Sequence, residues 1–252
     1  MPVEESANML IMTAAYLRDA SPQDAHSYAV QHFKVLQKWA DYLVKNGLDP
    51  ASQLQTDDFS GPIKSSANLA LKAVVGVGAM SKIAEAVGND AEVGRYRGTA
   101  KSMAGEWVKR AQSKQGNHLT LAYAQDPTWS LKYNAFADRV LGLDLIPPSI
   151  THEEGLFYAA RANPYGIPLD NRNTYTKTDW EFWTAAATDN PDVRRLIIDD
   201  VFRFVNESTS RVAFSDWYDT VTGKRIGFMA RPVIGGVFSL LVLKPRHVAA
   251  QP

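Results

Sequence analysis

The helical segments of this sequence alternate between two kinds, and this alternation constrains the fold more than any other feature. Segments of the first kind are apolar nearly all round, and they cover residues 8–17, 69–87, 180–187 and 232–243. Segments of the second kind are amphipathic, as in residues 25–46. A helix that is apolar on every side must be buried, whereas an amphipathic helix faces water on one side. The alternation predicts an all-α fold of about nine helices in an inner and an outer layer, an α/α toroid; a plain helical bundle is the alternative.

In a toroid the inner helices run parallel, so the loops that precede them open on the same face. The expected inner helices begin near five positions: Ser6, Ser65, Trp129, Lys177 and Arg231. The glycines Gly76 and Gly78 fall inside the second of these helices and are expected to allow close helix packing.

The loops before these helices combine carboxylates with aromatic and hydroxyl residues, in residues 2–6, 56–61, 126–133, 173–180 and 214–219. Hydrolysis by water needs one carboxylate that takes a proton and another that gives one, with pKa values pushed apart by burial and neighbouring charges. The candidate catalytic residues are Glu4, Glu5, Asp57, Asp58 and Asp216. Each of them, taken singly, is also explained as a helix cap that interacts with the helix dipole.

Other polar and aromatic residues at these loops and at the neighbouring helix starts are candidates for substrate binding. They are Asn8, Asn68, Trp129, Lys132, Tyr133, Tyr175, Lys177, Asp179, Trp180, Trp217 and Tyr218. The two lysines could bind a substrate carboxylate and the tryptophans could form pocket walls. The alternatives are solvated lysines and aromatic residues of the core.

The composition argues against several classes of function. Lys+Arg and Asp+Glu both number 27, so the basic excess that is typical of nucleic-acid binding is absent. No apolar run reaches the roughly 18–20 residues of a membrane span. Without cysteine the chain has no thiol nucleophile and no thiolate metal site. The five histidines are scattered without ligand spacing and no cofactor motif is present, so no metal and no cofactor are expected.

Seven segments of the chain resemble the signature blocks of the fungal glutaminase A-type family, in the family's order. They are residues 1–10, 54–61, 67–73, 128–134, 165–170, 175–180 and 214–220. The sequence departs from the family pattern at Ala7, where glycine is usual, and at Pro62, Ser65 and Ser66, where histidine and asparagine are expected.

The resemblance implies an extracellular hydrolase that converts L-glutamine to L-glutamate and ammonia, on a six-hairpin toroid like that of certain glycosidases. It further implies that residues 1–252 form one helical domain that lacks the family's first helices and N-terminal β-rich region. Uncovered toroid faces would then favour association, and the isolated chain would be less active than a longer relative. A glycoside hydrolase-like protein and a catalytically inactive remnant or binding module remain alternatives.

Overall fold

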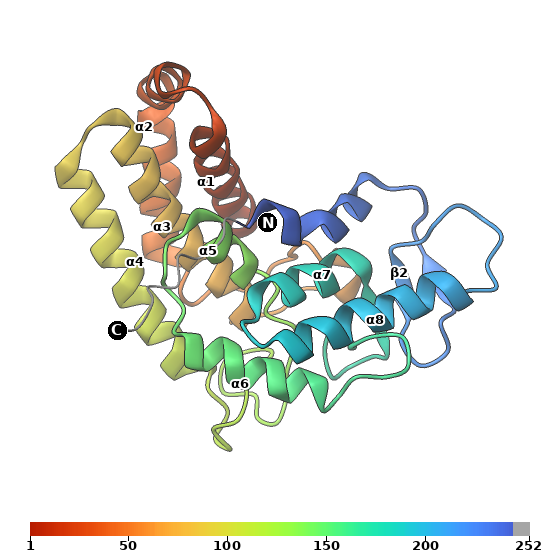
Figure 1. Ribbon diagram of the computed structural model, residues 1–252. Coiled ribbons are helices and arrows are strands. Elements are labelled where there is room, and N and C mark those ends of the chain that lie inside the picture. The colour runs from red at the N-terminus through yellow and green to blue at the C-terminus, as the bar shows by residue number, and fades with distance from the viewer. Residues whose placement is uncertain (244–252) are drawn as a thin grey trace, which may run out of the picture.

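The computed structural model describes residues 1–243, so the end of the expected domain, residues 244–252, lies outside the described part. Four helical hairpins follow one another along the chain (Figure 1). They consist of α1 (Pro2–Asp19) with α2 (Pro22–Asn46), α3 (Ala67–Val87) with α4 (Asp90–Ala111), α5 (Ala135–Leu141) with α6 (Pro148–Ala159), and α7 (Thr178–Ala187) with α8 (Pro191–Glu207). Two 3-10 helices, η1 (Asp58–Ser60) and η2 (Pro232–Val242), complete the helical elements of this part.

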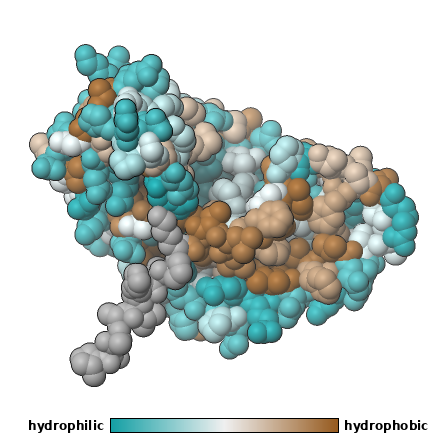
Figure 2. All heavy atoms as spheres, turned by 45° about the horizontal axis from the view of Figure 1, so that its top comes forward, coloured by the Kyte–Doolittle hydropathy of each residue, from teal (hydrophilic) through white to brown (hydrophobic). Residues whose placement is uncertain are grey.

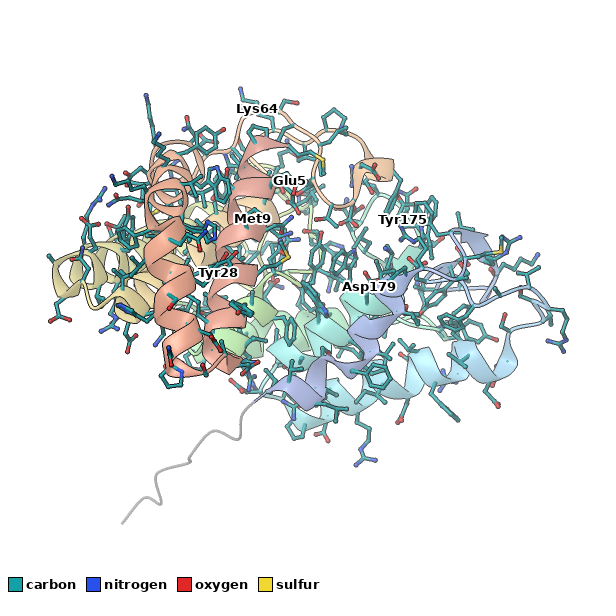
Figure 3. All side chains as sticks on the ribbon, turned by 90° about the horizontal axis from the view of Figure 1, so that it is seen from above. Glu5, Met9, Tyr28, Lys64, Tyr175 and Asp179 are labelled. Carbon is teal, nitrogen blue, oxygen red and sulfur yellow. The ribbon has the colours of Figure 1, made fainter. Side chains whose placement is uncertain are left out.

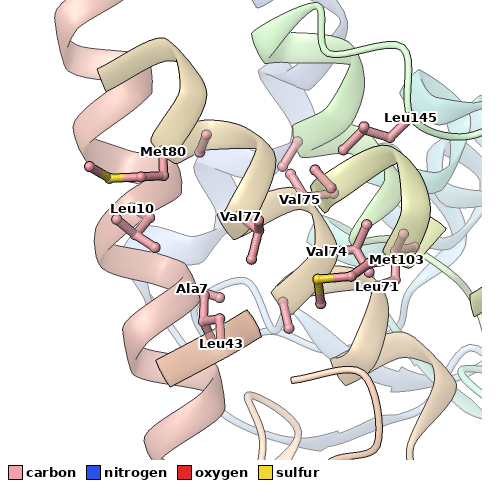
Figure 4. Packing of buried hydrophobic residues seen from close by; sticks show 14 of the residues in the cluster. Ala7, Leu10, Leu43, Leu71, Val74, Val75, Val77, Met80, Met103 and Leu145 are labelled. Carbon is pink, nitrogen blue, oxygen red and sulfur yellow. The ribbon is translucent and has the colours of Figure 1, made fainter. Parts of the chain in front are cut away.

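The hairpins place an inner helix before an outer one, as the alternation predicts. Helix α3 is buried over nearly its whole length between α1, α2 and α4. Its glycines permit this contact, because a Cβ at Gly76 would lie 3.1 Å from the Cα of Ala7 on α1. A Cβ at Gly78 would lie 2.9 Å from the side chain of Leu143. Figure 4 shows the resulting core, in which Leu10, Leu43 and Val77 pack from three helices.

The amphipathic helices form the outer layer because each buries only one stripe. On α2, Ala29, Leu36, Ala40 and Leu43 are buried, while the polar side faces solvent. Local sequence fixes where two outer helices begin: the Ser21 hydroxyl accepts from the backbone N–H of Asp24, and the Asn190 side chain accepts from those of Asp192 and Val193. Such caps satisfy N–H groups that the first turn leaves free.

A small antiparallel sheet, which the sequence does not predict, lies beside the fourth hairpin. Its strands are β1 (Tyr175–Lys177), β2 (Trp217–Asp219) and β3 (Arg225–Gly227), in the order β1-β2-β3. Lys177 pairs with Trp217, and Thr176 pairs with Tyr218. Because side chains alternate between the faces of a strand, Lys177 and Trp217 share one face and Thr176 and Tyr218 share the other.

Two of the expected inner segments are less buried than their composition predicts. On α1, Met12 is 57% exposed and Tyr16 is 50% exposed, and on η2, Leu241 is 79% exposed. Figure 2 shows apolar side chains gathered on an open face of the molecule. The expectation of burial on every side was therefore wrong for α1 and η2, since no described element covers these sides. Association through them stays a prediction.

Candidate active site

The starts of the inner helices meet at one end of the molecule, and Asp57 shows this most directly. Its carboxylate is buried and accepts a hydrogen bond from the hydroxyl of Tyr133, just before α5, at 2.5 Å. It also accepts one from Nε1 of Trp180, on the first turn of α7, at 2.8 Å. Three of the five loops that were predicted to converge therefore share one face.

A second buried group joins the start of α1 to α3. The ammonium of Lys72 forms an ion pair with Oε1 of Glu4, and both side chains are almost completely buried. The hydroxyl of Thr56 donates to the same Glu4 oxygen and lies 3.2 Å from Lys72 Nζ. Thr56 itself is exposed as a residue, so it lies between the buried ion pair and the solvent.

A third group surrounds Lys177 at the end of β1. Its Nζ lies 3.0 Å from Oδ2 of Asp216 and 3.6 Å from Oδ2 of Asp179. Nη2 of Arg231 lies 2.6 Å from the same Oδ2, and Nε of Arg231 donates to Oδ1 of Asp216 at 3.3 Å. Asp216 is therefore a buried carboxylate between two cations, whereas Oδ1 of Asp179 is buried without a hydrogen-bond partner.

These environments push the pKa values of the carboxylates apart. Burial raises the pKa of Asp179 to about 6, and Lys177 opposes this only in part. Burial also raises the pKa of Asp57, against the hydrogen bonds from Tyr133 and Trp180. At Asp216 burial acts in the same direction, but hydrogen bonds from Arg231 and Lys177 outweigh it and lower the pKa. The site thus holds neighbouring carboxyl groups whose pKa values are moved in opposite directions.

The rim of the site is polar and aromatic. Glu5 and Asp58 are exposed, and Asn8 is half-buried with its amide 3.4 Å from Glu5. Figure 3 shows Glu5 and Met9 on α1 and Asp179 and Tyr175 on the neighbouring part of the molecule. The rings of Phe59, Tyr175 and Trp217 contact one another beside Lys177.

Three predicted binding residues lie elsewhere. Lys132 is buried and donates to the carbonyls of Leu119 and Ser130, in a separate polar group with Glu154. Trp129 is buried against the rings of Phe157 and Tyr158. Tyr218 stacks on Phe204, and its hydroxyl donates to the carbonyl of Tyr165, on the sheet face away from Trp217. None of the three is brought into the carboxylate cluster. Asn68, by contrast, lines a small cavity of about 20 Å³ together with Asp57.

Three residues of the cluster were missing from the predicted site: Thr56, Lys72 and Arg231. Lys72 does carry a signal in the sequence, because no other charged residue occurs between residues 67 and 81 of this helix. A lysine that cannot reach water needs a buried partner, and that partner is Glu4. Thr56 and Arg231 carry no comparable signal.

A hollow of about 350 Å³ adjoins this cluster and is lined by Phe214, Asp216, Arg231 and Pro232 among others. This volume falls in the range of small-molecule sites. A larger hollow, of about 730 Å³, lies at the opposite ends of the helices, near Leu17, His26 and Arg139. We favour the smaller hollow, because Asp216, a buried carboxylate whose pKa is lowered by its cationic partners, lines it.

The hairpins and the converging helix starts define an all-α domain of the α/α-toroid class. The sequence profile of the glutaminase A six helical-hairpin domain matches residues 1–241. The chain belongs to this family.

Two relatives place the chain more closely. It is 41% identical to Glutaminase A of Aspergillus oryzae over 248 residues, which are 96% of this chain and 35% of the relative. It is 32% identical over 250 residues to a protein of Arthroderma benhamiae named Probable glutaminase, covering 87% of this chain and 29% of that protein. The chain spans about a third of the length of these relatives.

Proposed function

We propose that the chain hydrolyses the side-chain amide of L-glutamine to L-glutamate and ammonia at the carboxylate cluster. The observation that carries this proposal is the pair Asp179 and Asp216, whose pKa values are moved in opposite directions around one lysine. Family membership and the names of the two relatives support glutamine as the substrate.

The two ends of the cluster suit different roles. Glu4 is ion-paired with Lys72 and accepts from Thr56, so it is placed to take a proton. Asp179, with a pKa raised to about 6, is placed to give a proton to the leaving nitrogen. Burial raises the pKa of Tyr133, and the charges of Asp57, Glu4 and Asp179 raise it further. Both carboxylate oxygens of Asp57 accept hydrogen bonds, one from Tyr133 and one from Trp180, so Asp57 holds its loop in position.

The direct test is ammonia release from L-glutamine by the purified chain and by its variants. Glu4→Gln and Asp179→Asn should each lower turnover by roughly 10²–10⁴-fold, the usual contribution of one acid or base. Asp199→Asn, at an exposed position on α8, serves as the control and should not change turnover. Retained turnover in both cluster variants would refute the assignment, and no ammonia release by the parent chain would refute the activity.

One observation favours a carbohydrate substrate as the second candidate. Phe59, Tyr175 and Trp217 form a half-exposed aromatic group beside the acids, and such rings stack on sugars as well as on one another. The same preparation should therefore be assayed with aryl glycosides. Release of the aryl group without ammonia release would favour this candidate, whereas ammonia release alone would favour the amidase.

A further inference from the structure

The hydroxyl of Thr56 makes contacts that an ordinary loop residue does not make. Its hydroxyl donates to Oε1 of Glu4 and lies 3.2 Å from the ammonium of Lys72, so it contacts both members of a buried ion pair. Thr56 is also exposed, although its two partners are almost completely buried. A hydroxyl on an exposed residue that contacts both a base and a cation has the arrangement of an activated nucleophile.

The loop around Thr56 is held in place on both sides. The next residue, Asp57, accepts hydrogen bonds from Tyr133 and Trp180. On the other side, Gln55 is buried and accepts from the hydroxyl of Ser66, the N-cap of α3. Nucleophilic attack requires a side chain with a restricted position, and these contacts restrict the backbone of Thr56 from two directions.

We propose that Thr56 is the nucleophile of the reaction and that hydrolysis passes through a γ-glutamyl ester on its Oγ1. This inference rests on the proposed function and deepens it. Thr56 Oγ1 attacks the carbonyl carbon of the side-chain amide, and its proton moves to Glu4. The C–N bond breaks, and Asp179 gives a proton to the nitrogen, which leaves as ammonia. Lys72 stabilises the negative charge that develops on Oγ1.

Water then completes the cycle. It attacks the ester carbonyl, its proton moves to Asp179, and the C–O bond to Thr56 breaks. Oγ1 recovers its proton from Glu4, so L-glutamate is released and every side chain returns to its initial state. The two steps together consume one glutamine and one water and produce one glutamate and one ammonia.

The test combines kinetics with mass spectrometry on the full chain. The variants are Thr56→Val, which has the same shape without the hydroxyl, Thr56→Ser, which keeps it, and Ser52→Ala, an exposed hydroxyl of the same connection, as the control. With L-glutamine and an acid quench, the peptide containing Thr56 should gain the mass of one glutamyl group. Thr56→Val should lose the adduct and at least 10²-fold in turnover, whereas Thr56→Ser and Ser52→Ala should keep both.

The outcomes separate this inference from the proposed function. Ammonia release that persists in Thr56→Val, without an adduct in the parent, would overturn the nucleophile and leave the glutaminase activity standing. If the parent chain releases no ammonia, covalent labelling by a glutamine analogue with a diazoketone in place of the amide tests whether Thr56 is nucleophilic. Labelling of Thr56 in the parent chain, with no labelling of the Thr56→Val variant, supports Thr56 as the nucleophile. A parent chain that is not labelled at Thr56 overturns the proposal.

Discussion

Asp57 accepts a hydrogen bond from Nε1 of Trp180 at 2.8 Å, although the two residues are separated by 123 positions in the chain. This contact ties the loop before α3 to the first turn of α7. Both groups are buried, so the contact lies inside the packed fold. The site and the toroid are thus stabilised by the same interactions.

Loss of the Tyr133 hydroxyl should destabilise the fold more than loss of a matched hydroxyl elsewhere. Tyr133 donates to the buried carboxyl group of Asp57, whereas Tyr123 donates to the backbone carbonyl of Leu48 at 2.9 Å. Hydrogen bonds to charged groups contribute about 1.5–3 kcal/mol and neutral ones about 0.5–1.5 kcal/mol. Urea unfolding of Tyr133→Phe and Tyr123→Phe checks this order. Equal losses would mean that Asp57 gains no special stabilisation from Tyr133.

Stability should fall as pH rises because of Glu181. Burial raises the pKa of this residue from 4.5 to about 8. A raised pKa means that the folded chain holds the proton more tightly, so the stabilisation is complete below pH 4.5 and is lost as pH rises through about 8. Glu181→Gln should remove this part of the pH dependence, while Glu153→Gln at an exposed position should keep it. The test is the free energy of unfolding of the parent and both variants, measured from pH 4.5 to about pH 8. Parallel curves for all three proteins would contradict the assignment to Glu181.

A methyl group at Gly236 should push η2 away from α7. A Cβ at this position would lie 2.6 Å from Cβ of Asp179, whereas a Cβ at Gly235 meets nothing within 4 Å. Overpacking of this kind costs typically about 1–3 kcal/mol. Hydrogen exchange should therefore increase in η2 and at the start of α7 in Gly236→Ala and stay unchanged in Gly235→Ala. Equal exchange in the two variants would show that η2 does not depend on this contact.

The alkaline limb of the rate profile should move to lower pH in Asp216→Asn. The negative charge of Asp216 raises the pKa of Asp179, and Lys177 lowers it. Removing the charge of Asp216 therefore lowers the pKa of Asp179 and releases Lys177 to lower it further. If Asp179 is the proton donor, kcat/KM of the parent should decline above about pH 6, and that of the variant should decline earlier. A limb that stays in place would exclude Asp179 as the donor.

The face that carries the site could be predicted from the sequence because helical periodicity alone separates inner from outer helices. Four of the five expected inner starts lie within four residues of the observed ones, as with Ser65 and Ala67. The third expected start, Trp129, was wrong, because α5 begins at Ala135. The residues between them are held extended by tertiary contacts, such as the bond from Leu131 N to Leu169 O at 2.8 Å.

The small sheet explains why the orientation of Tyr218 could not be predicted from the sequence. Strands of three residues are too short to show a period of two, so nothing distinguished the orientation of Trp217 from that of Tyr218. The same short strands place Lys177 next to Asp216. Thr56 could not be identified either, because an exposed hydroxyl has no pattern of its own before Glu4 and Lys72 meet behind it.

The pairing of β1 with β2 also determines how the chain responds to an insertion. Thr176 and Tyr218 are fully buried on one face, and Lys177 and Trp217 point to the other. An extra residue within β2 would exchange the faces, so the phenol of Tyr218 would turn to the site while the indole of Trp217 entered a core already filled by Phe204. Length changes here therefore damage solubility and activity together. Substitutions at Trp217 can alter the site alone, which makes this side chain the safer place to re-engineer substrate preference.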